Sequence, residues 1–331
     1  MNKRDKKVSI GIVGVGHLGK HHVKHLAAMD NVECVGFYDI DKLRSAVIAD
    51  KYNVKSYDSL STLLCDCDAV TIVTPTDTHF HIASACLTAG KHVFIEKPIT
   101  KTVPEAEELL ILSSNNKVLI QVGHIERLNP ALIPLKNYSI SPKYIEIQRL
   151  APYDVRGTDV PVVLDKMIHD IDILLFLVNS EIENIDANGI SILTDSIDIA
   201  NAKIRFYNGT IANITSSRVA QDHVRKTKIF QQDLYITIDF LLGLTEIYRV
   251  LDPSDPDPNA IQDAPFHYGG KDKKIIYEKP DLPLFDALKA ELENFTNSVN
   301  GSATPIVDGQ AGKNALELAT NIHDLILEDL H

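Results

Sequence analysis

Short apolar runs alternate with longer amphipathic segments along the first 124 residues. The apolar runs have the length of strands and end in polar or turn-forming residues. The segments 77–90 and 103–116 between them carry apolar residues at helical spacing. Buried runs separated by helices are typical of parallel strands. The pattern therefore predicts an α/β fold with a doubly wound parallel sheet, whose strands lie at 8–13, 32–41, 69–75, 91–98 and 117–124.

The pattern changes in the second half of the chain, which we assign to a separate domain over residues 125–331. Strand-like runs follow one another there without helices between them, and Asn208-Gly209 predicts a hairpin turn. The Asp- and Pro-rich segment 251–265 predicts a solvated loop, and helical spacing returns at 284–299 and 309–330. This half predicts an α+β domain with a largely antiparallel open sheet, whose strands lie at 144–150, 183–194, 199–218, 226–240 and 245–251.

The first apolar run leads into a glycine motif, Gly14-Val-Gly16-His17-Leu18-Gly19, and then into a helix. Strand, G-x-G-x-x-G and helix in this order are typical of dinucleotide-binding domains. The first glycine permits a tight turn, the second lets the backbone approach a pyrophosphate, and the third allows close helix packing. The N–H groups at the start of the helix suit the phosphates. We therefore expect residues 1–124 to form a Rossmann domain.

The second apolar run ends in Asp39, about 20 residues beyond the glycines. A carboxylate at this position accepts hydrogen bonds from an adenosine ribose and repels a 2'-phosphate, which favours NAD over NADP. Alternatively, Asp39 or Asp41 caps the helix that begins near Lys42. The glycine motif favours ribose binding by Asp39, while Lys42 and Arg44 leave NADP open as the less favoured cofactor.

Polar residues also follow the later strands of the predicted parallel sheet. Ligands of such sheets bind beyond the carboxyl ends of the strands. The residues at these ends are Thr74, Pro75, Thr76, Glu96, Lys97, Pro98 and His124. Their position alone predicts that several of them lie around one ligand site.

Composition limits the classes of function that fit the chain. The formal net charge of -12 argues against non-specific binding to nucleic acid, which needs a basic face. No run reaches the roughly 18 apolar residues that span a membrane. The basic start of the chain is not followed by an apolar run of the kind found in signal peptides. We therefore expect a cytoplasmic protein of two domains that contacts neither nucleic acid nor membrane.

The spacing of cysteines and histidines does not predict a metal site. Cys65 and Cys67 form a C-x-C pair with no second pair downstream, which favours reduced thiols. His21 and His25 are spaced for one helix face, but no acid or thiol with convincing spacing joins them. We interpret these two histidines and His22 as the surface of a helix near the cofactor.

The helix predicted over 164–177 is mostly apolar but carries several ionisable residues. At about 100 degrees per residue, Asp165, His169 and Asp172 fall within a stripe roughly 60 degrees wide, and Asp170 points away from it. Burying unpaired charge costs several kcal/mol, so such a stripe must face water, a partner or a polar cleft. One interpretation is a polar seam between domains with a satisfied core histidine. The other, which we favour, is a catalytic face.

Four motifs, GVGHLG, TPTDTH, EKP and DKMIHDID, occur in this order over nearly the whole chain. Together they resemble the Gfo/Idh/MocA oxidoreductases, which act on sugars and cyclitols with a nicotinamide cofactor. The resemblance implies cofactor contacts from the glycine loop and Asp39. It also implies that Thr74, Pro75 and His79, with Thr76 in the same loop, lie beside the nicotinamide ribose. Glu96 and Lys97 are implied to contact the cofactor from the end of the active-site strand.

The resemblance also assigns catalytic and substrate-binding roles. It makes Asp165 a substrate-binding acid and His169 the acid/base residue that takes the proton while a hydride leaves for the nicotinamide. An imidazole suits this role because its ordinary pKa is about 6.5. Lys97 can stabilise the developing alkoxide, although it remains an alternative base. The chemistry requires Lys97 and His169 to face one gap beside the nicotinamide. Many members of the family have an aromatic-rich motif where this chain has GHIERLNP. His124 and Arg127 lie in this departing segment and are expected to tune substrate choice.

The segment RLAPYDVRGTDVPVVLD, 149–165, is similar to that of bacterial members thought to act on UDP-sugars, including UDP-N-acetylglucosamine 3-dehydrogenases. A nucleotide-sugar substrate is therefore expected. Arg127, Arg149 or Arg156 could bind its diphosphate, or could instead pair with surface acids. Inositol or simple-sugar oxidation and a non-catalytic NAD-binding sensor remain alternatives. The family also implies a homodimer or homotetramer formed through the C-terminal sheet.

Overall fold

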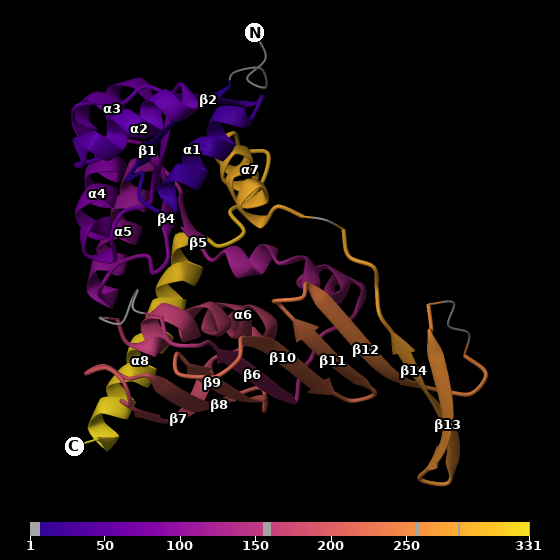
Figure 1. The fold of residues 1–331 in the computed structure, drawn as a ribbon. Coiled ribbons are helices and arrows are strands. Elements are labelled where there is room, and N and C mark those ends of the chain that lie inside the picture. Colours follow the sequence, from indigo (N-terminus) through magenta and orange to yellow (C-terminus); the bar gives the residue numbers. More distant parts are fainter. Residues whose placement is uncertain (1–6, 155–159, 256–258, 284, 331) are drawn as a thin grey trace. The chain divides into compact units, whose positions relative to one another are not determined.

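The computed structural model describes residues 7–154, 160–255, 259–283 and 285–330 (Figure 1). The chain divides into two compact units. The first contains residues up to 127 together with 286–317, and the second contains 128–285 together with the segment from 318 onward.

The first unit is built on a five-stranded parallel sheet of order β2-β1-β3-β4-β5, as the alternating pattern predicted. Its strands are β1 Val8–Val13, β2 Val32–Tyr38, β3 Ala69–Ile72, β4 His92–Glu96 and β5 Ile120–Gly123. Its helices are α1 Gly19–Ala28, α2 Lys42–Tyr52, α3 Leu60–Asp66, α4 Thr76–Thr88, α5 Val103–Asn116, α7 Ala287–Val299 and the first part of α8 Gly309–Asp329. Because all five strands run parallel, their carboxyl ends lie at one edge of the sheet.

A segment from late in the chain completes the core of the first unit. Leu292 and Phe295 of α7 are fully buried in the same cluster as Ile10, Ile12 and Phe94 of the sheet. The rings of Phe94 and Phe295 lie 5.8 Å apart in an edge-to-face arrangement. Contacts therefore group residues 286–317 with the first unit, whereas the sequence-based division at 124/125 had placed them with the second.

The second unit contains a nine-stranded sheet of order β13-β14-β12-β11-β10-β6-β9-β8-β7. All neighbours are antiparallel except β6 and β9, so the predicted largely antiparallel sheet is confirmed. Its strands are β6 Tyr144–Leu150, β7 Ile182–Ile190, β8 Ile199–Phe206, β9 Ile211–Ser217, β10 Val224–Gln231, β11 Leu234–Asp239, β12 Leu244–Leu251, β13 Gln262–Tyr268 and β14 Lys271–Glu278. Gly209, with φ +84°, forms the predicted hairpin turn between β8 and β9.

One prediction for this sheet was wrong in part. The sequence was interpreted as a solvated loop over 251–265, but residues 262–265 begin strand β13. Within the described residues β13 pairs only with β14 and is therefore an edge strand. An edge strand has one side with no neighbouring strand to receive hydrogen bonds, so Pro265, which has no N–H to donate, is tolerated there. The Asp- and Pro-rich composition concealed this strand.

Helices cover one face of the antiparallel sheet. The 3-10 helix η2 Pro130–Asn137 and helix α6 Ile168–Val178 pack Leu132 and Ile173 against Ile236, Ile238 and Ile247 of the sheet. The helix predicted over 164–177 is not α-helical throughout, because residues Val163–Met167 form a π-helical turn, η3. The remaining elements are the short 3-10 helix η1 Ile125–Leu128 and the end of α8.

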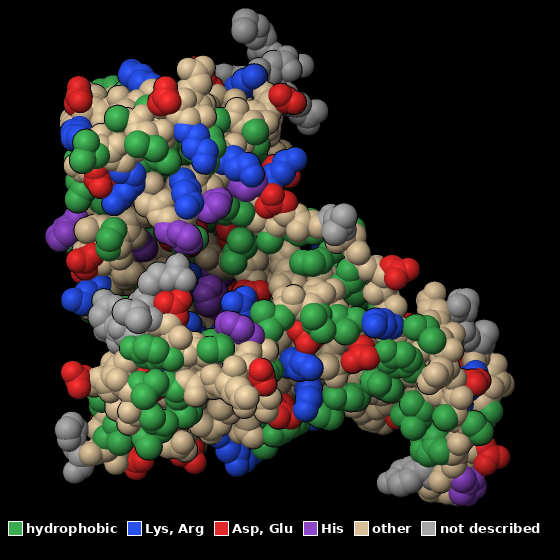
Figure 2. All heavy atoms as spheres, viewed as in Figure 1, with side chains coloured by type: hydrophobic (Ala, Val, Ile, Leu, Met, Phe, Trp, Pro, Cys, Tyr) green, Lys and Arg blue, Asp and Glu red, His purple; other side chains and the backbone are tan. Residues whose placement is uncertain are grey.

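Charged side chains are interspersed on the face of the molecule that Figure 2 shows, where Lys and Arg lie among Asp and Glu. The net charge of -12 is therefore not gathered into a single acidic surface on that face. Among the described helices, none combines the length and the apolar character needed to cross a bilayer.

Candidate functional site

A cleft of about 460 Å³ opens in the first unit at the carboxyl ends of the parallel strands. Ligands of doubly wound sheets bind at this edge. Nearly all of its lining comes from the glycine loop, the end of β2, the segment after β3 and the end of β4. The lining residues predicted from the sequence as cofactor contacts are Gly14, Gly16, His17, Leu18, Asp39, Thr74, Pro75, Glu96 and Lys97.

The glycine loop has the geometry that a phosphate-binding turn requires. Gly14 has φ +87°, and a Cβ there would lie 2.6 Å from the carbonyl oxygen of Val73. A Cβ on Gly19 would lie 2.0 Å from the carbonyl oxygen of Gly14, so only glycine lets α1 begin this close to β1. A Cβ on Gly16 would meet only the Nη1 of Arg44, at 3.9 Å. Gly19 therefore serves packing and does not line the cleft.

Asp39 is held rigidly at the end of β2. Its carboxylate accepts hydrogen bonds from the backbone N–H of Val15 and of Asp41, each at 2.8 Å, and the residue is 5% exposed. The helix-capping role considered for this position belongs to Asp41, whose side chain accepts a hydrogen bond from the Arg44 N–H at the start of α2. Asp39 is thus directed at the glycine loop.

Arg44 gives the cleft its cationic side. Its guanidinium lies 3.4 Å from the Asp39 carboxylate and 3.1 Å from that of Asp41, while remaining about half exposed. The side chain thus neutralises part of the charge that would repel a 2'-phosphate. From the sequence, Arg44 was noted only as one of two basic residues that leave NADP open as the less favoured cofactor. Other lining residues were not predicted from the sequence, namely Val13, Tyr38, Ile40, Val73, Thr78 and Ile82.

His79 does not line the cleft but lies beneath its wall. The imidazole is 1% exposed, and its two nitrogens lie 2.9 Å from the carbonyl oxygens of Thr74 and Pro98. Burial lowers the pKa of His79, and the two carbonyl contacts oppose that shift. The ring therefore connects the loop after β3 with the segment after β4. The ring is thus placed to support two segments of the cleft wall, and its direct contact with the cofactor stays a prediction.

His22 is a further residue of this site that the sequence analysis placed wrongly. It was assigned to a helix surface, but it is 1% exposed, and its Nε2 lies 3.1 Å from the carboxylate of Glu96. Its ring also packs edge-on against Phe94. Helix α1 turns this residue toward β4, because the close contact at Gly19 brings the helix against the sheet. Within the described residues, no cluster of His, Cys, Asp and Glu is arranged to hold a metal ion.

The second unit carries the ionisable residues of the DKMIHDID motif on η3 and α6. Asp165 lies in the π-helical turn, half-buried, 3.4 Å from the ammonium of Lys166. His169 lies one turn further, also partly buried, and Asp172 is 1% exposed. The regular spacing assumed for the stripe does not hold across the π turn. Lys97 and His169 belong to different units, so their approach to one substrate oxygen remains a prediction.

Asp170 and Arg149 form a buried ion pair within the second unit. Nε and Nη2 of Arg149 on β6 donate to the two carboxylate oxygens of Asp170 at 2.7 and 2.9 Å. Both side chains are nearly inaccessible, at 6% and 5% exposure. The paired guanidinium therefore makes Arg149 a structural residue, so of the two uses considered, pairing with an acid is the one observed.

The remaining predicted substrate contacts lie at the end of the first unit or outside the described residues. His124 follows β5 and is buried, and Arg127 lies in η1 with its side chain partly exposed. Thr76 begins α4. Arg156 lies outside the described residues.

Comparison with known proteins agrees with this architecture. Residues 8–124 match the model of the oxidoreductase family with an NAD-binding Rossmann fold. Residues 154–236 match the model of the GFO/IDH/MocA C-terminal domain. The parallel sheet, the glycine loop and the cleft therefore define a nicotinamide-dependent oxidoreductase.

Full-length relatives give the family of the whole chain. A UDP-N-acetylglucosamine 3-dehydrogenase of Acidithiobacillus ferrooxidans is 36% identical over 313 residues, covering 94% of this chain and 95% of the relative. A crystal structure of the enzyme of that name and organism superposes with a TM-score of 0.88 over 98% of this chain and 100% of its own, at 34% identity. A myo-inositol 2-dehydrogenase of Thermotoga maritima is 26% identical over 93% of both chains.

This chain belongs to the Gfo/Idh/MocA family of oxidoreductases. The family, the fold class and the NAD-dependent dehydrogenase predicted from the sequence are thereby confirmed. The roles of individual site residues stay predictions.

Proposed function

We propose that this chain is an NAD-dependent dehydrogenase that oxidises a secondary ring hydroxyl of a nucleotide sugar, a UDP-N-acetylhexosamine. The observation that carries the proposal is the 36% identity to a UDP-N-acetylglucosamine 3-dehydrogenase over almost the full length of both chains. The inositol dehydrogenase relative has a similar coverage but only 26% identity. A nucleotide sugar is therefore favoured over a free cyclitol.

The residues around the cleft of the first unit fit NAD. The open space at Gly16 leaves room for a pyrophosphate against the backbone, and the fixed carboxylate of Asp39 suits a ribose diol. Thr74, Pro75, Thr76 and Glu96 would flank the nicotinamide half. When bound, the oxidised nicotinamide supplies the acceptor for a hydride. Arg44, beside Asp39, could also receive a 2'-phosphate, but the buried acid favours NAD.

The side chains of the chain supply the proton chemistry. Oxidation of an alcohol breaks one O–H and one C–H bond, and the hydride and the proton leave in different directions. A ring nitrogen of His169 takes the hydroxyl proton, and the ammonium of Lys97 donates a hydrogen bond to the oxygen as negative charge develops. Asp165 holds a neighbouring hydroxyl or orients the imidazole. The proposal requires Lys97 and His169 to reach the same substrate oxygen.

An arginine that binds the diphosphate must have a guanidinium that the ligand can reach. The side chain of Arg149 is only 6% exposed and is paired with Asp170, which argues against this role for it. Arg127, which follows β5 with its side chain partly exposed, is the described candidate, with His124 beside it in sequence. Arg156 is the second candidate, from sequence position alone. A guanidinium suits this role because it can bind phosphate oxygens with two parallel hydrogen bonds.

The proposal is tested by following reduction of NAD at 340 nm with equal concentrations of candidate alcohols. UDP-N-acetylglucosamine, UDP-N-acetylgalactosamine, UDP-glucose, N-acetylglucosamine and myo-inositol form a sufficient set. Turnover with a UDP-N-acetylhexosamine and none with the free sugar supports the proposal. Turnover with myo-inositol alone would establish the alternative cyclitol dehydrogenase. NAD binding without turnover of any alcohol would instead favour a sensor.

We also propose that the chain forms a homodimer or homotetramer through the uncovered face of the nine-stranded sheet. Five aromatic rings stack from strand to strand on that face, with centroid separations of 5.8, 4.6, 5.5 and 5.0 Å, at Tyr144, Phe230, Tyr235, Tyr248 and Tyr277. A continuous row of partly exposed rings is typical of an interface. Light scattering should show an oligomer that Tyr235→Lys dissociates and Asn115→Lys on α5 leaves intact. An unchanged mass for Tyr235→Lys would contradict this interface.

A cytoplasmic location stays a prediction.

A further inference from the structure

The turn that carries Asp165 departs from regular helical geometry. The N–H of Ile168 donates to the carbonyl of Val163, five residues earlier, so the turn from Val163 to Met167 is π-helical. Such turns are rare and occur mostly as single insertions into α-helices, frequently at functional sites. Because the turn is not favoured by helix geometry alone, contacts outside it must determine how Asp165 is presented.

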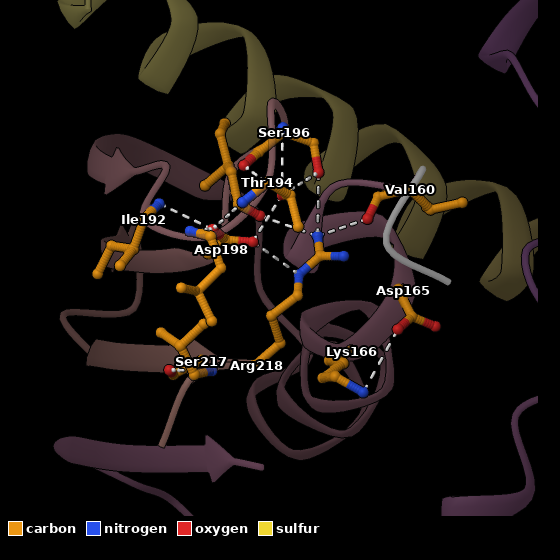
Figure 3. A network of polar contacts seen from close by, with 12 residues as sticks. Val160, Asp165, Lys166, Ile192, Thr194, Ser196, Asp198, Ser217 and Arg218 are labelled. Carbon is orange, nitrogen blue, oxygen red and sulfur yellow. Dashed lines mark hydrogen bonds and ion pairs between the residues drawn. The ribbon is translucent and has the colours of Figure 1, made fainter. Parts of the chain in front are cut away.

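The chain entering this turn is fastened to the segment that precedes β8 and to a side chain that follows β9. The N–H of Val162 donates to the carbonyl of Ile197 at 3.0 Å, and the N–H groups of Leu164 and Asp165 both donate to the carbonyl of Pro161 at 3.0 Å. The carbonyl of Val160 accepts a hydrogen bond of 2.5 Å from a guanidinium nitrogen of Arg218 (Figure 3). The start of the turn is thus held to residues outside it by one backbone hydrogen bond, to Ile197, and by one side chain, that of Arg218.

Arg218 reaches this position from just beyond the end of β9. It is 3% exposed, and the Nη2 that binds Val160 also donates to the carbonyl of Ile197 at 2.9 Å and lies 3.4 Å from the hydroxyl of Ser196. Its Nε lies 3.4 Å from the carboxylate of Asp198. One guanidinium therefore joins the entry of the π turn to the segment 196–198 that precedes β8.

Asp198 is fixed by its own neighbours and in turn fixes Arg218. One oxygen accepts hydrogen bonds from the backbone N–H groups of Ile192, Leu193 and Thr194 at 2.8, 2.6 and 3.0 Å. The other accepts from the hydroxyl of Thr194 at 2.7 Å. These contacts converge on one point in Figure 3, with Asp165 and Lys166 on the far side of Arg218. The carboxylate is therefore a rigid anchor for the guanidinium.

We propose that Arg218, held by Asp198, is a positioning residue that fixes the π-helical turn and so sets where Asp165 is presented to substrate. The inference rests on the proposed function, because it takes Asp165 to be a substrate-binding acid. Stability alone is a weaker explanation, since a buried ion pair contributes about as much as apolar side chains of the same volume. Here the guanidinium donates a hydrogen bond of 2.5 Å to the carbonyl of Val160, which leads into the site.

The test compares Arg218→Met, which keeps much of the volume but removes every donor, with Arg218→Lys, which keeps the charge and one donor group. Arg249→Met is the matched control, because it breaks another arginine–carboxylate pair of the same sheet, that with Glu278 at 2.6 Å. Arg218→Met should lower kcat/KM for the sugar about 10–100-fold, since misplacement by about 1 Å costs this much. Arg218→Lys should recover part of the loss. The Kd for NAD and the Arg249→Met activity should stay unchanged.

A double-mutant cycle separates positioning from general stability. In an Asp165→Asn background, Arg218→Met should cost less than about 3-fold, because the group that it positions is already lost. Equal losses in both backgrounds, or an equal loss from Arg249→Met, would overturn the proposal. Unchanged kcat/KM in Arg218→Met would overturn it as well.

Hydrogen exchange provides a measurement that does not depend on the substrate. Arg218→Met should accelerate exchange of the amides at 162–168 at least about 10-fold while leaving the β6 amides protected. Unchanged exchange at 162–168, or uniform acceleration throughout the second unit, would reject a positioning role. If the wild-type protein oxidises no alcohol, the proposed function fails, and the exchange pattern still decides whether Arg218 fixes this turn.

Discussion

The carboxylate of Asp39 accepts a hydrogen bond from the backbone N–H of Val15 at 2.8 Å. This contact joins the end of β2 to the middle of the glycine loop, so the two parts of the cofactor site are fixed relative to each other. The other carboxylate oxygen is held by the N–H of Asp41. The acid is therefore oriented before any ligand arrives, and its replacement should affect both ribose recognition and the shape of the loop.

Asp39→Ala should raise the Kd for NAD about 10-fold or more, because hydrogen bonds to a charged group contribute about 1.5–3 kcal/mol. It should also weaken discrimination against NADP, since Arg44 then lies beside the ribose without a competing carboxylate. Titration calorimetry with both cofactors measures the two effects. Ser59→Ala, which removes the cap of α3, is the control and should leave cofactor preference unchanged. An unaltered preference in Asp39→Ala would mean that another residue reads the ribose.

His169→Ala should lower the rate of hydride transfer about 10²–10⁴-fold, because a general base contributes this much. NAD should still bind, since its proposed contacts all lie in the first unit. Single-turnover absorbance at 340 nm measures the rate, and fluorescence titration measures cofactor binding. Near-normal turnover would reject His169 as the base. Lys97→Met in the same assay tests the alternative base, because near-normal turnover there would reject Lys97 as the residue that takes the proton.

His79→Ala should loosen the two loops that the ring connects. Loss of a buried hydrogen bond costs about 1–3 kcal/mol, because one carbonyl is left without its donor. The melting temperature should fall, and the Kd for NAD should rise, because Thr74 lies in the cleft wall. His79→Asn, with a shorter side chain, should recover little of the binding. Ser113→Ala, which removes a buried contact to the Val118 carbonyl elsewhere in the unit, should lower stability alone. Equal NAD affinity in His79→Ala would show that the loops keep their shape without the ring.

The first unit was largely predictable because its signals are local. The glycine motif and the short apolar runs each identify one element and its neighbour, and the position of Asp39 follows from them. The contribution of α7 to the core of this unit was not predictable, because Phe295 and Phe94 are about two hundred residues apart in the sequence and come into contact only in the folded chain. The buried contact of His22 depends in the same way on how α1 packs, which the three neighbouring histidines do not reveal.

The second unit was predictable in class but not in its polar contacts. Alternating residues identify the strands, whereas a periodicity of 3.6 residues per turn cannot reveal a π-helical turn such as Val163–Met167. The partner of Asp170 lies on β6, and the partner of Asp198 lies beyond β9. Neither pair leaves a trace in local spacing, because Asp170 contacts Arg149 only when α6 lies beside β6, and Asp198 contacts Arg218 only when β8 and β9 pair as a hairpin.

The buried carboxylate of Asp198 should make the stability of the second unit sensitive to acid. Burial alone would raise the pKa of Asp198, but the N–H groups of Leu193, Ile192 and Thr194 and the Thr194 hydroxyl outweigh it and lower the pKa to about 2 from the ordinary 3.8. A lowered pKa in the folded state contributes stability that is present above about pH 4 and lost as the pH falls toward 2. The contribution is about 2 kcal/mol at neutral pH, at about 1.4 kcal/mol for each pKa unit.

Asp198→Asn removes this charge while nearly preserving the shape of the side chain. Urea unfolding at pH 7 should show a loss of about 2 kcal/mol or more, since the amide also places a donor against backbone N–H groups. The difference from wild type should shrink as the pH falls from about 4 to 2, where wild-type Asp198 becomes protonated. The exposed Asp281→Asn should change stability little at any pH. A difference that stays constant down to pH 2 would mean that the charge of Asp198 is not what stabilises this turn.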